Sequence, residues 1–192
     1  MSVDHASLRF RNAHGLLTPA GDVYCHAFNS PLLKADPFSD LTIFQQDAIY
    51  HHSIERDHEG NFWVPCRIEP KSVNLGGIKF LDDGVAKISP DGRLLFRKSV
   101  AQILKQNNFG YLVDGKGQAN EDPIHLNDIE PCLSAGILWE RGDLFLSLRH
   151  QSAVLLYRPR SNKVIWLQQG PWIHQHDVDV LSDSTLVIFN NA

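Results

Sequence analysis

Short apolar runs alternate with turn-forming residues along most of the chain. The clearest runs, rich in β-branched and aromatic residues, are 62–64, 84–89, 94–96, 143–149, 152–157 and 163–167. Gly, Asp, Asn and Pro stand between them, a pattern typical of antiparallel strands joined by tight turns. One helix is predicted at 100–108, where Ser99 is a candidate N-cap and Val100, Ile103 and Leu104 share a face. Apart from this helix, the pattern predicts an all-β protein.

The strands recur in units that open with a histidine. Four segments, which begin at His14, His52, His125 and His176, each contain a histidine, a strand, a turn and a second strand. A four-stranded propeller blade takes about 40–45 residues, and the longer middle interval accommodates the predicted helix. A β-sandwich also has regular strands, but it gives no reason for a histidine at each start. We therefore predict a single partial β-propeller domain over 1–192, with blade-like units at about 13–47, 48–113, 124–169 and 174–192.

The number of units is smaller than a closed propeller needs. The sequence supplies about three and a half units, whereas propellers close with roughly four to eight blades. The last unit stops after an inner hairpin at 185–192. We expect a fragment of a longer propeller, and the alternative is self-association of half-propellers through their open blade edges.

Composition narrows the class of protein. Of the 192 residues, 43% are hydrophobic and 21% are charged, so the chain can bury a core. The net charge of −4, without a cluster of Lys and Arg, argues against nucleic-acid binding. No apolar run approaches the roughly 20 residues of a membrane span, and the first residues show no signal peptide. Cys25, Cys66 and Cys132 fit neither a zinc knuckle nor a redox pair.

Histidine is the residue type that suggests chemistry, since the chain has ten. Repeats arranged about an axis would aim the histidines of equivalent positions at one point. With Arg149, which ends an apolar strand, such imidazoles would suit a tetrahedral oxyanion such as phosphate or sulfate. Asn127, two residues past His125 on an extended strand, would share its face. Ordinary structural roles, in turns or bonded to backbone, are expected for His5, His26, His58 and His150.

The ordered set of motifs resembles the arylsulfotransferase (aryl-sulfate sulfotransferase) family over roughly Asp47 to the C-terminus. The resemblance rests on His-Leu-Asn-Asp-Ile from His125, on Leu-Phe-Leu-Ser-Leu-Arg up to Arg149, and on Gln-His-Asp around His176. An earlier segment, His-His-Ser-Ile-Glu-Arg-Asp from His51, resembles a preceding blade of the family. The resemblance implies a six-bladed propeller whose central channel holds the catalytic residues, in a parent protein that is periplasmic or secreted.

The resemblance also implies a reaction. In such enzymes a histidine is transiently sulfated by an aryl sulfate and then passes the sulfuryl group to a phenolic acceptor, without a metal, a cofactor or a nucleotide sulfate donor. By motif, His176 corresponds to the sulfated nucleophile, and His125 and Arg149 correspond to groups that bind the sulfuryl oxygens. His52 corresponds to a further catalytic histidine, and we expect it to protonate the departing phenolate. Candidate substrate-binding residues are Asn127, His51 and His174.

Two other classes of function stay open. A metal-dependent propeller hydrolase or lyase would use His125, His174 and His176 as a zinc site, because residues two apart on a strand share a face. A non-catalytic propeller would bind anionic or phenolic ligands. For the 192-residue chain itself, we expect the histidines and Arg149 on one concave side of a water-open channel. Water weakens electrostatic stabilisation, so little turnover is expected.

Overall fold

Recurrent glycine turns set the hairpins of the chain. In the computed structural model, which describes residues 12–74, 80–114 and 121–191, three hairpin turns share one geometry. Gly21, Gly60 and Gly92 have φ angles of 87°, 82° and 85°. Each donates its N–H to the carbonyl three residues earlier. A left-handed residue at this turn position favours glycine, so the sequence itself determines where these hairpins close.

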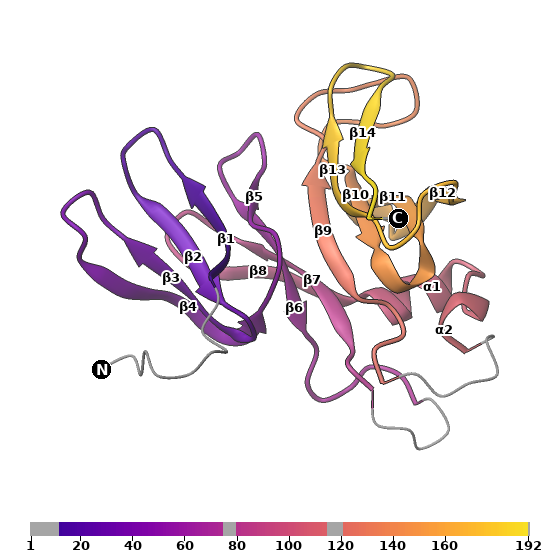
Figure 1. The fold of residues 1–192 in the computed structure, drawn as a ribbon, viewed down its shortest axis with the longest axis horizontal. Helices are drawn as coiled ribbons and strands as arrows, with labels where there is room; N and C mark the ends of the chain where they lie inside the picture. Colours follow the sequence, from indigo (N-terminus) through magenta and orange to yellow (C-terminus); the bar gives the residue numbers. More distant parts are fainter. Residues whose placement is uncertain (1–11, 75–79, 115–120, 192) are drawn as a thin grey trace.

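The strands form three antiparallel sheets (Figure 1). The largest runs in the order β1-β2-β3-β4-β6-β7-β8, with β5 paired to β6. Its strands are β1 (Asn12–Leu17), β2 (Val23–Ala27), β3 (Ser30–Ala35), β4 (Leu41–Tyr50), β5 (Glu55–Arg56), β6 (Phe62–Arg67), β7 (Asp83–Ile88) and β8 (Leu94–Ser99). The second sheet contains β9 (Leu126–Pro131), β10 (Leu144–Leu148), β11 (Ala153–Arg158) and β12 (Lys163–Gln169), and the third pairs β13 (His176–Val180) with β14 (Leu186–Phe189).

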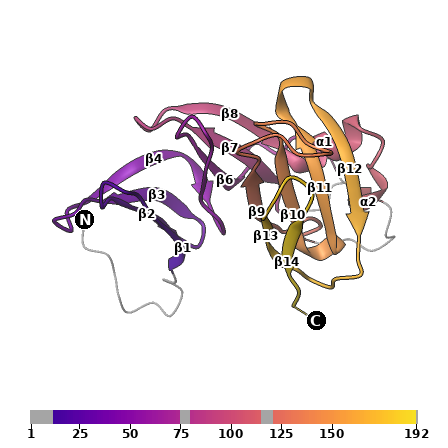
Figure 2. The same cartoon turned by 90° about the horizontal axis from the view of Figure 1, so that it is seen from above.

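These sheets are the blades of a partial β-propeller. The largest sheet is two four-stranded units, β1–β4 and β5–β8, which meet at the register pair Tyr50–Cys66. The units follow one another from β1–β4 through β5–β8 to β9–β14 (Figures 1 and 2). Strands β5 and β6 contact β9, and β9 in turn contacts β13, so the opening strands of successive units lie side by side. The predicted antiparallel, mostly β architecture is confirmed.

Apolar cores lie between successive units. One cluster joins the first two units and includes Tyr24, Leu32, Tyr50, Phe62 and Val64. A second joins β5–β8 to β9–β12 and includes Val85, Ile103, Leu126, Leu146 and Leu155. A third, around Phe145, Leu156 and Val178, joins β9–β12 to the β13–β14 hairpin. Each unit is therefore stabilised mainly by the faces of its neighbours.

The helix predicted at 100–108 is present as α1 (Val100–Gln106). The Ser99 hydroxyl accepts the Gln102 N–H at 3.1 Å and caps the helix, and Val100, Ile103 and Leu104 are buried. A short second helix, α2 (Tyr111–Asp114), follows and was not predicted. Two 3₁₀ turns, η1 (Arg149–Gln151) and η2 (Pro159–Ser161), close the hairpins on either side of β11. In the described part of the chain, no helix has the length and apolar character needed to cross a membrane.

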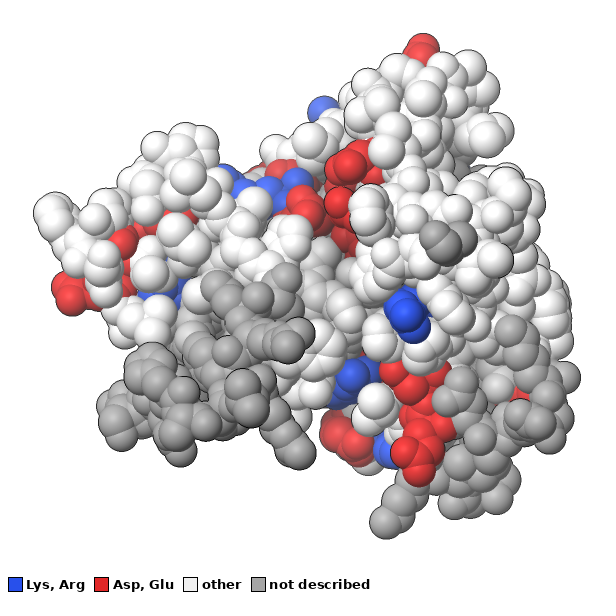
Figure 3. Space-filling view, in the orientation of Figure 1, with Lys and Arg blue, Asp and Glu red and all other residues white. Residues whose placement is uncertain are grey.

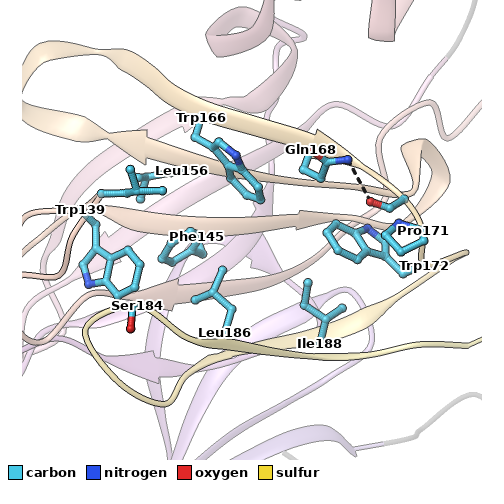
Figure 4. A pocket seen from close by; sticks show the side chains of 12 residues that line it. Trp139, Phe145, Leu156, Trp166, Gln168, Pro171, Trp172, Ser184, Leu186 and Ile188 are labelled. Carbon is cyan, nitrogen blue, oxygen red and sulfur yellow. Dashed lines mark hydrogen bonds between the residues drawn. The ribbon is translucent and has the colours of Figure 1, made fainter.

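An aromatic cavity lies where the β13–β14 hairpin meets the sheet β9–β12. Its volume is about 400 Å³. Figure 4 shows side chains from the sheet and from the hairpin facing one another across this space. The lining includes Trp139, Phe145, Trp166, Trp172 and Ile188. The hairpin therefore packs against the sheet without filling all of the apolar space between them.

A core substitution tests the packing between the second and third units. Leu146 on β10 is fully buried in the cluster that joins them. We expect Leu146→Ala to lower the free energy of unfolding by about 2–5 kcal/mol, because it removes buried methyl groups and leaves a cavity. Leu95→Ala is the matched control, since Leu95 is 50% exposed, and it should change stability by no more than about 0.5 kcal/mol. Urea unfolding followed by circular dichroism measures both, and equal losses would contradict the assigned core.

Candidate functional site

Three histidines occupy the same backbone position, just ahead of the opening strand of a unit. His52, His125 and His174 have φ angles of 61°, 54° and 50°, in the left-handed region. Residues other than glycine adopt this conformation rarely, and His, Asn and Asp are among those that do so most often. The equivalent residue of the last unit is therefore His174, whereas the sequence pattern placed His176 there. The sequence prediction counted residues back from the hairpin turn to find the equivalent histidine. The β13–β14 register shifts between His176 and Val178, so this count gives the wrong position in the last unit.

A row of imidazoles runs across the openings of three units. The ring centres of His52 and His125 lie 4.9 Å apart, and those of His125 and His150 lie 4.4 Å apart. His174 follows at 6.2 Å from His150. The expectation of an ordinary turn role for His150 was therefore incomplete. His150 does sit in a turn, η1, but its ring also contacts His125, which comes from a distant part of the chain.

Asp122 holds two members of this row. The His125 Nδ1 lies 2.5 Å from the Asp122 Oδ2, and the His150 Nδ1 donates to the Asp122 carbonyl at 2.6 Å. These bonds orient both rings through Nδ1. Asp122 was not among the predicted site residues. The signal that could have identified it is the carboxylate three residues before a histidine.

Arg149 and His125 both act electrostatically on His176. Strand β10 ends at Leu148, and Arg149 opens η1 with its N–H donated to the His125 carbonyl at 3.1 Å. Burial lowers the pKa of His176, and the nearby positive charge of Arg149 and the His125 ring lower it further. His176 is itself one of the groups that lower the pKa of His52. The ring contact between His52 and His125 and the backbone bond between Arg149 and His125 place these three residues side by side, and His176 lies within electrostatic reach of them.

His51 lies behind this cluster. Its side chain is fully buried, and its Nδ1 is 2.8 Å from the Nδ1 of His52. On the other side, its Nε2 lies 3.3 Å from the Oδ1 of Asp83, which also pairs with Arg67. His51 is a link between a buried carboxylate and His52. The sequence suggested that His51 binds substrate, and its fully buried position gives that role no support.

The charge state of His52 differs from the one expected. Burial, with the nearby His51 and His125, lowers the pKa of His52 to about 2. A ring with this pKa is neutral at pH 7, so it has no imidazolium proton to give to a departing phenolate. A neutral His52 can still donate or accept a hydrogen bond at the edge of the cluster.

Asn127 and Gln175 join the third unit to the fourth. Asn127 is buried, and its Nδ2 donates to the Gln175 carbonyl at 2.7 Å. The Gln175 amide in turn donates to the Ala153 carbonyl at 2.8 Å and to the Ser147 hydroxyl at 3.1 Å. Asn127 was expected to share a face with His125, but that argument assumed an extended backbone, and His125 is left-handed. Asn127 therefore orients the segment that carries His174 and His176.

Carboxylates follow the histidines along the same opening strands. Burial, with the nearby Asp128 and Glu130, raises the pKa of Glu55 to about 8. Burial likewise raises the pKa values of Asp128 and Glu130 to about 7. Asp177 and Asp179, on the next strand, add to this repulsion. Figure 3 shows acidic side chains gathered in the hollow beside β9 and β13. The histidines thus lie just ahead of the opening strands, and the carboxylates lie along those strands.

The three-histidine metal site expected as an alternative is not assembled. His174 is exposed and left-handed ahead of β13, so it does not share a strand face with His176. Within residues 12–74, 80–114 and 121–191, the group of His, Cys, Asp or Glu side chains with converging ligand atoms is Asp122, His125 and His150.

Comparisons with known proteins identify a family. The model of the arylsulfotransferase (ASST) family matches residues 14–192. No curated protein matches the chain. Among solved structures, a streptogramin B lyase is similar over 92% of this chain and 47% of its own, with 13% identity and a TM-score of 0.48. A virginiamycin B lyase from Staphylococcus aureus is similar over 93% of this chain and 63% of its own, with 9% identity and a TM-score of 0.46. The chain thus covers less than two thirds of either structure.

The raised pKa of Glu55 predicts a specific dependence of stability on pH. The folded-state pKa of about 8 exceeds the ordinary value of 4.5. The folded chain therefore holds this proton more tightly, and the stability gained below about pH 4.5 is lost as the pH rises through about 8. We expect Glu55→Gln to be more stable than the unmodified chain at about pH 8.5, with the difference vanishing near about pH 4.

Chemical unfolding at several pH values measures this difference. Glu121→Gln is the matched control, because Glu121 is an exposed carboxylate outside the acidic cluster. A difference for Glu55→Gln that is constant across the range would contradict the acidic cluster.

Proposed function

The chain belongs to the arylsulfotransferase family, and from this premise we propose that it transfers a sulfuryl group from an aryl sulfate to a phenol through a sulfated histidine. The observation that carries the proposal is the row of imidazoles at the openings of three units, with Arg149 joined to His125 by a backbone hydrogen bond. Arg149 and His125 help to lower the pKa of His176, and His176 is one of the groups that lower the pKa of His52. Such a set can bind a tetrahedral anion and offer it a nucleophile.

The first half of the proposed reaction forms a bond between the sulfur and a ring nitrogen of His176. As this bond forms, the bond between sulfur and the aryl oxygen breaks, and the phenolate leaves and takes a proton from water. A neutral imidazole is required for the attack, and burial together with the Arg149 charge lowers the pKa of His176 toward that form. The Asn191 Nδ2 lies 2.9 Å from the His176 Nδ1 and can only donate to it, so Nδ1 holds the lone pair, and its bond to sulfur displaces this hydrogen bond.

Arg149 and His125 are proposed to hold the sulfuryl oxygens. Arg149 supplies a fixed positive charge and a planar fork of donors that match these oxygens. His125 is oriented by Asp122 through Nδ1, so its Nε2 is the nitrogen that can face the anion. Fixed donors aimed at developing charge usually contribute most to catalysis.

The second half of the proposed reaction restores the histidine. The acceptor phenol gives its proton to water, its oxygen bonds to the sulfur, and the bond between sulfur and His176 breaks. His52 is neutral at pH 7 because its pKa is about 2. We propose that it orients the phenol by a hydrogen bond, in place of the acid role expected from the sequence.

Substitution of His176 tests the covalent step. The protein is mixed with p-nitrophenyl sulfate labelled with ³⁵S, and the label is located by mass spectrometry under alkaline conditions. We expect label on His176 in the unmodified protein, and neither label nor phenol-dependent turnover in His176→Gln. His58→Gln is the matched control, because His58 is exposed, and it should label normally. Labelling needs one sulfation and no turnover, so it should appear even where turnover is slow. Label on any other residue, or its absence from the unmodified protein, would contradict the proposal.

Substitution of Arg149 tests the anion-binding role. We expect Arg149→Met to slow sulfation of His176 by about 10²–10³-fold, because one charged donor set is removed from the transition state. Arg149→Lys should recover part of the rate, since it keeps the charge and loses the fork. The matched control is Arg160→Met, whose side chain is 68% exposed. A stopped-flow measurement of p-nitrophenol release gives the rates, and equal rates for the two methionine variants would refute the role.

A further inference from the structure

Three side chains at the edge of the histidine row form a set of metal ligands. One ligand atom from each of Asp122, His125 and His150 lies within 4.8 Å of the others. No other group of three His, Cys, Asp or Glu residues in the part of the chain that the structure describes meets this condition. His125 belongs to the family motif, whereas Asp122 and His150 do not.

The distances require only small movements to accept an ion. The Asp122 Oδ2 lies 2.5 Å from the His125 Nδ1 and 3.9 Å from the His150 Nδ1. Around a tetrahedral zinc ion, neighbouring ligand atoms lie roughly 3.3 Å apart. The first contact must therefore open and the second close, each by less than about 1 Å, and the His150 Nδ1 must give up its bond to the Asp122 carbonyl, changes that side-chain rotation can provide.

Backbone bonds hold the two segments together. The N–H groups of Arg149 and His150 donate to the His125 and Ile124 carbonyls at 3.1 and 3.2 Å. The Gln151 Nε2 donates to the Pro123 carbonyl at 2.5 Å. The segments that carry the three ligands are thus fastened to each other independently of any ion, which lowers the entropy cost of binding one.

The donors and their exposure favour zinc. Two imidazoles and one carboxylate suit Zn²⁺, whereas Mg²⁺ and Ca²⁺ prefer sets made of oxygen alone. The Asp122, His125 and His150 side chains are 20%, 21% and 25% exposed. An ion can therefore enter from water and keep a fourth position for water or an anion.

We propose that Asp122, His125 and His150 form a zinc site at the mouth of the histidine row. Zinc bound between Asp122 and the His125 Nδ1 replaces the hydrogen bond that orients this ring toward the sulfuryl oxygens and turns the ring, so the ion acts as a reversible inhibitor of sulfation at His176. The inhibition rests on the proposed sulfotransfer. The binding of zinc does not.

Titration of the whole 192-residue chain with Zn²⁺ tests the binding. Calorimetry should show one equivalent bound, and Co²⁺ in its place should give the visible absorption of a tetrahedral nitrogen and oxygen site. We expect His150→Gln and Asp122→Asn each to weaken binding at least tenfold. His174→Gln is the matched control, because His174 ends the same row but lies outside the ligand set, and it should bind normally. Circular dichroism of each variant verifies that it is folded.

The outcomes separate the two proposals. Binding that is equally strong in His150→Gln, binding lost in His174→Gln, or no binding at tens of micromolar zinc would overturn the zinc site. If zinc binds as expected but no sulfation of His176 occurs in its absence, the site stands and the sulfotransferase proposal fails. If sulfation occurs, zinc should suppress it in the unmodified protein and at least tenfold less effectively in His150→Gln, and equal suppression in both would overturn the inhibitory role.

Discussion

A buried carboxylate, Asp83, connects the parts from which the candidate site is built. It is fully buried, and its Oδ1 pairs with Arg67 and faces the His51 Nε2 at 3.3 Å. Its Oδ2 accepts the Leu126 N–H at 2.8 Å, next to His125. One side chain of β7 thus supports the histidines that open two different units. Removing one partner of a buried charge typically costs about 3–5 kcal/mol, so this arrangement strongly constrains how the two blades sit together.

The same principle of mutual support extends to the later units. Asp128 accepts the Val178 N–H at 2.9 Å, and Ile129 donates its N–H to the Ser53 hydroxyl at 3.2 Å. Polar side chains of one blade therefore satisfy backbone groups of the next, where apolar packing alone would leave them unpaired. Because these bonds lie beside the histidines, blade packing and the geometry of the site cannot vary independently.

The local features of the fold could be predicted, because they depend on neighbours in sequence. The turn between the predicted strands at 84–89 and 94–96 and the Ser99 cap of α1 both follow from short patterns. The parts of the site that escaped prediction depend on contacts between distant segments. Asp83 meets His51 and Leu126 across two blades, and nothing near Asp83 in the sequence signals this. His150 likewise acquires its place through His125, not through its own neighbours.

The left-handed backbone at His52, His125 and His174 has a consequence for how this protein can diversify. A β-branched side chain there would incur a steric penalty before any effect on chemistry, while glycine or asparagine would fit. Random libraries at these positions should therefore return few folded variants outside a narrow set of residue types. New specificity is more accessible through residues such as Phe28, an exposed side chain outside the left-handed positions whose ring lies 4.9 Å from that of His52. The backbone thus limits which evolutionary routes lead away from histidine.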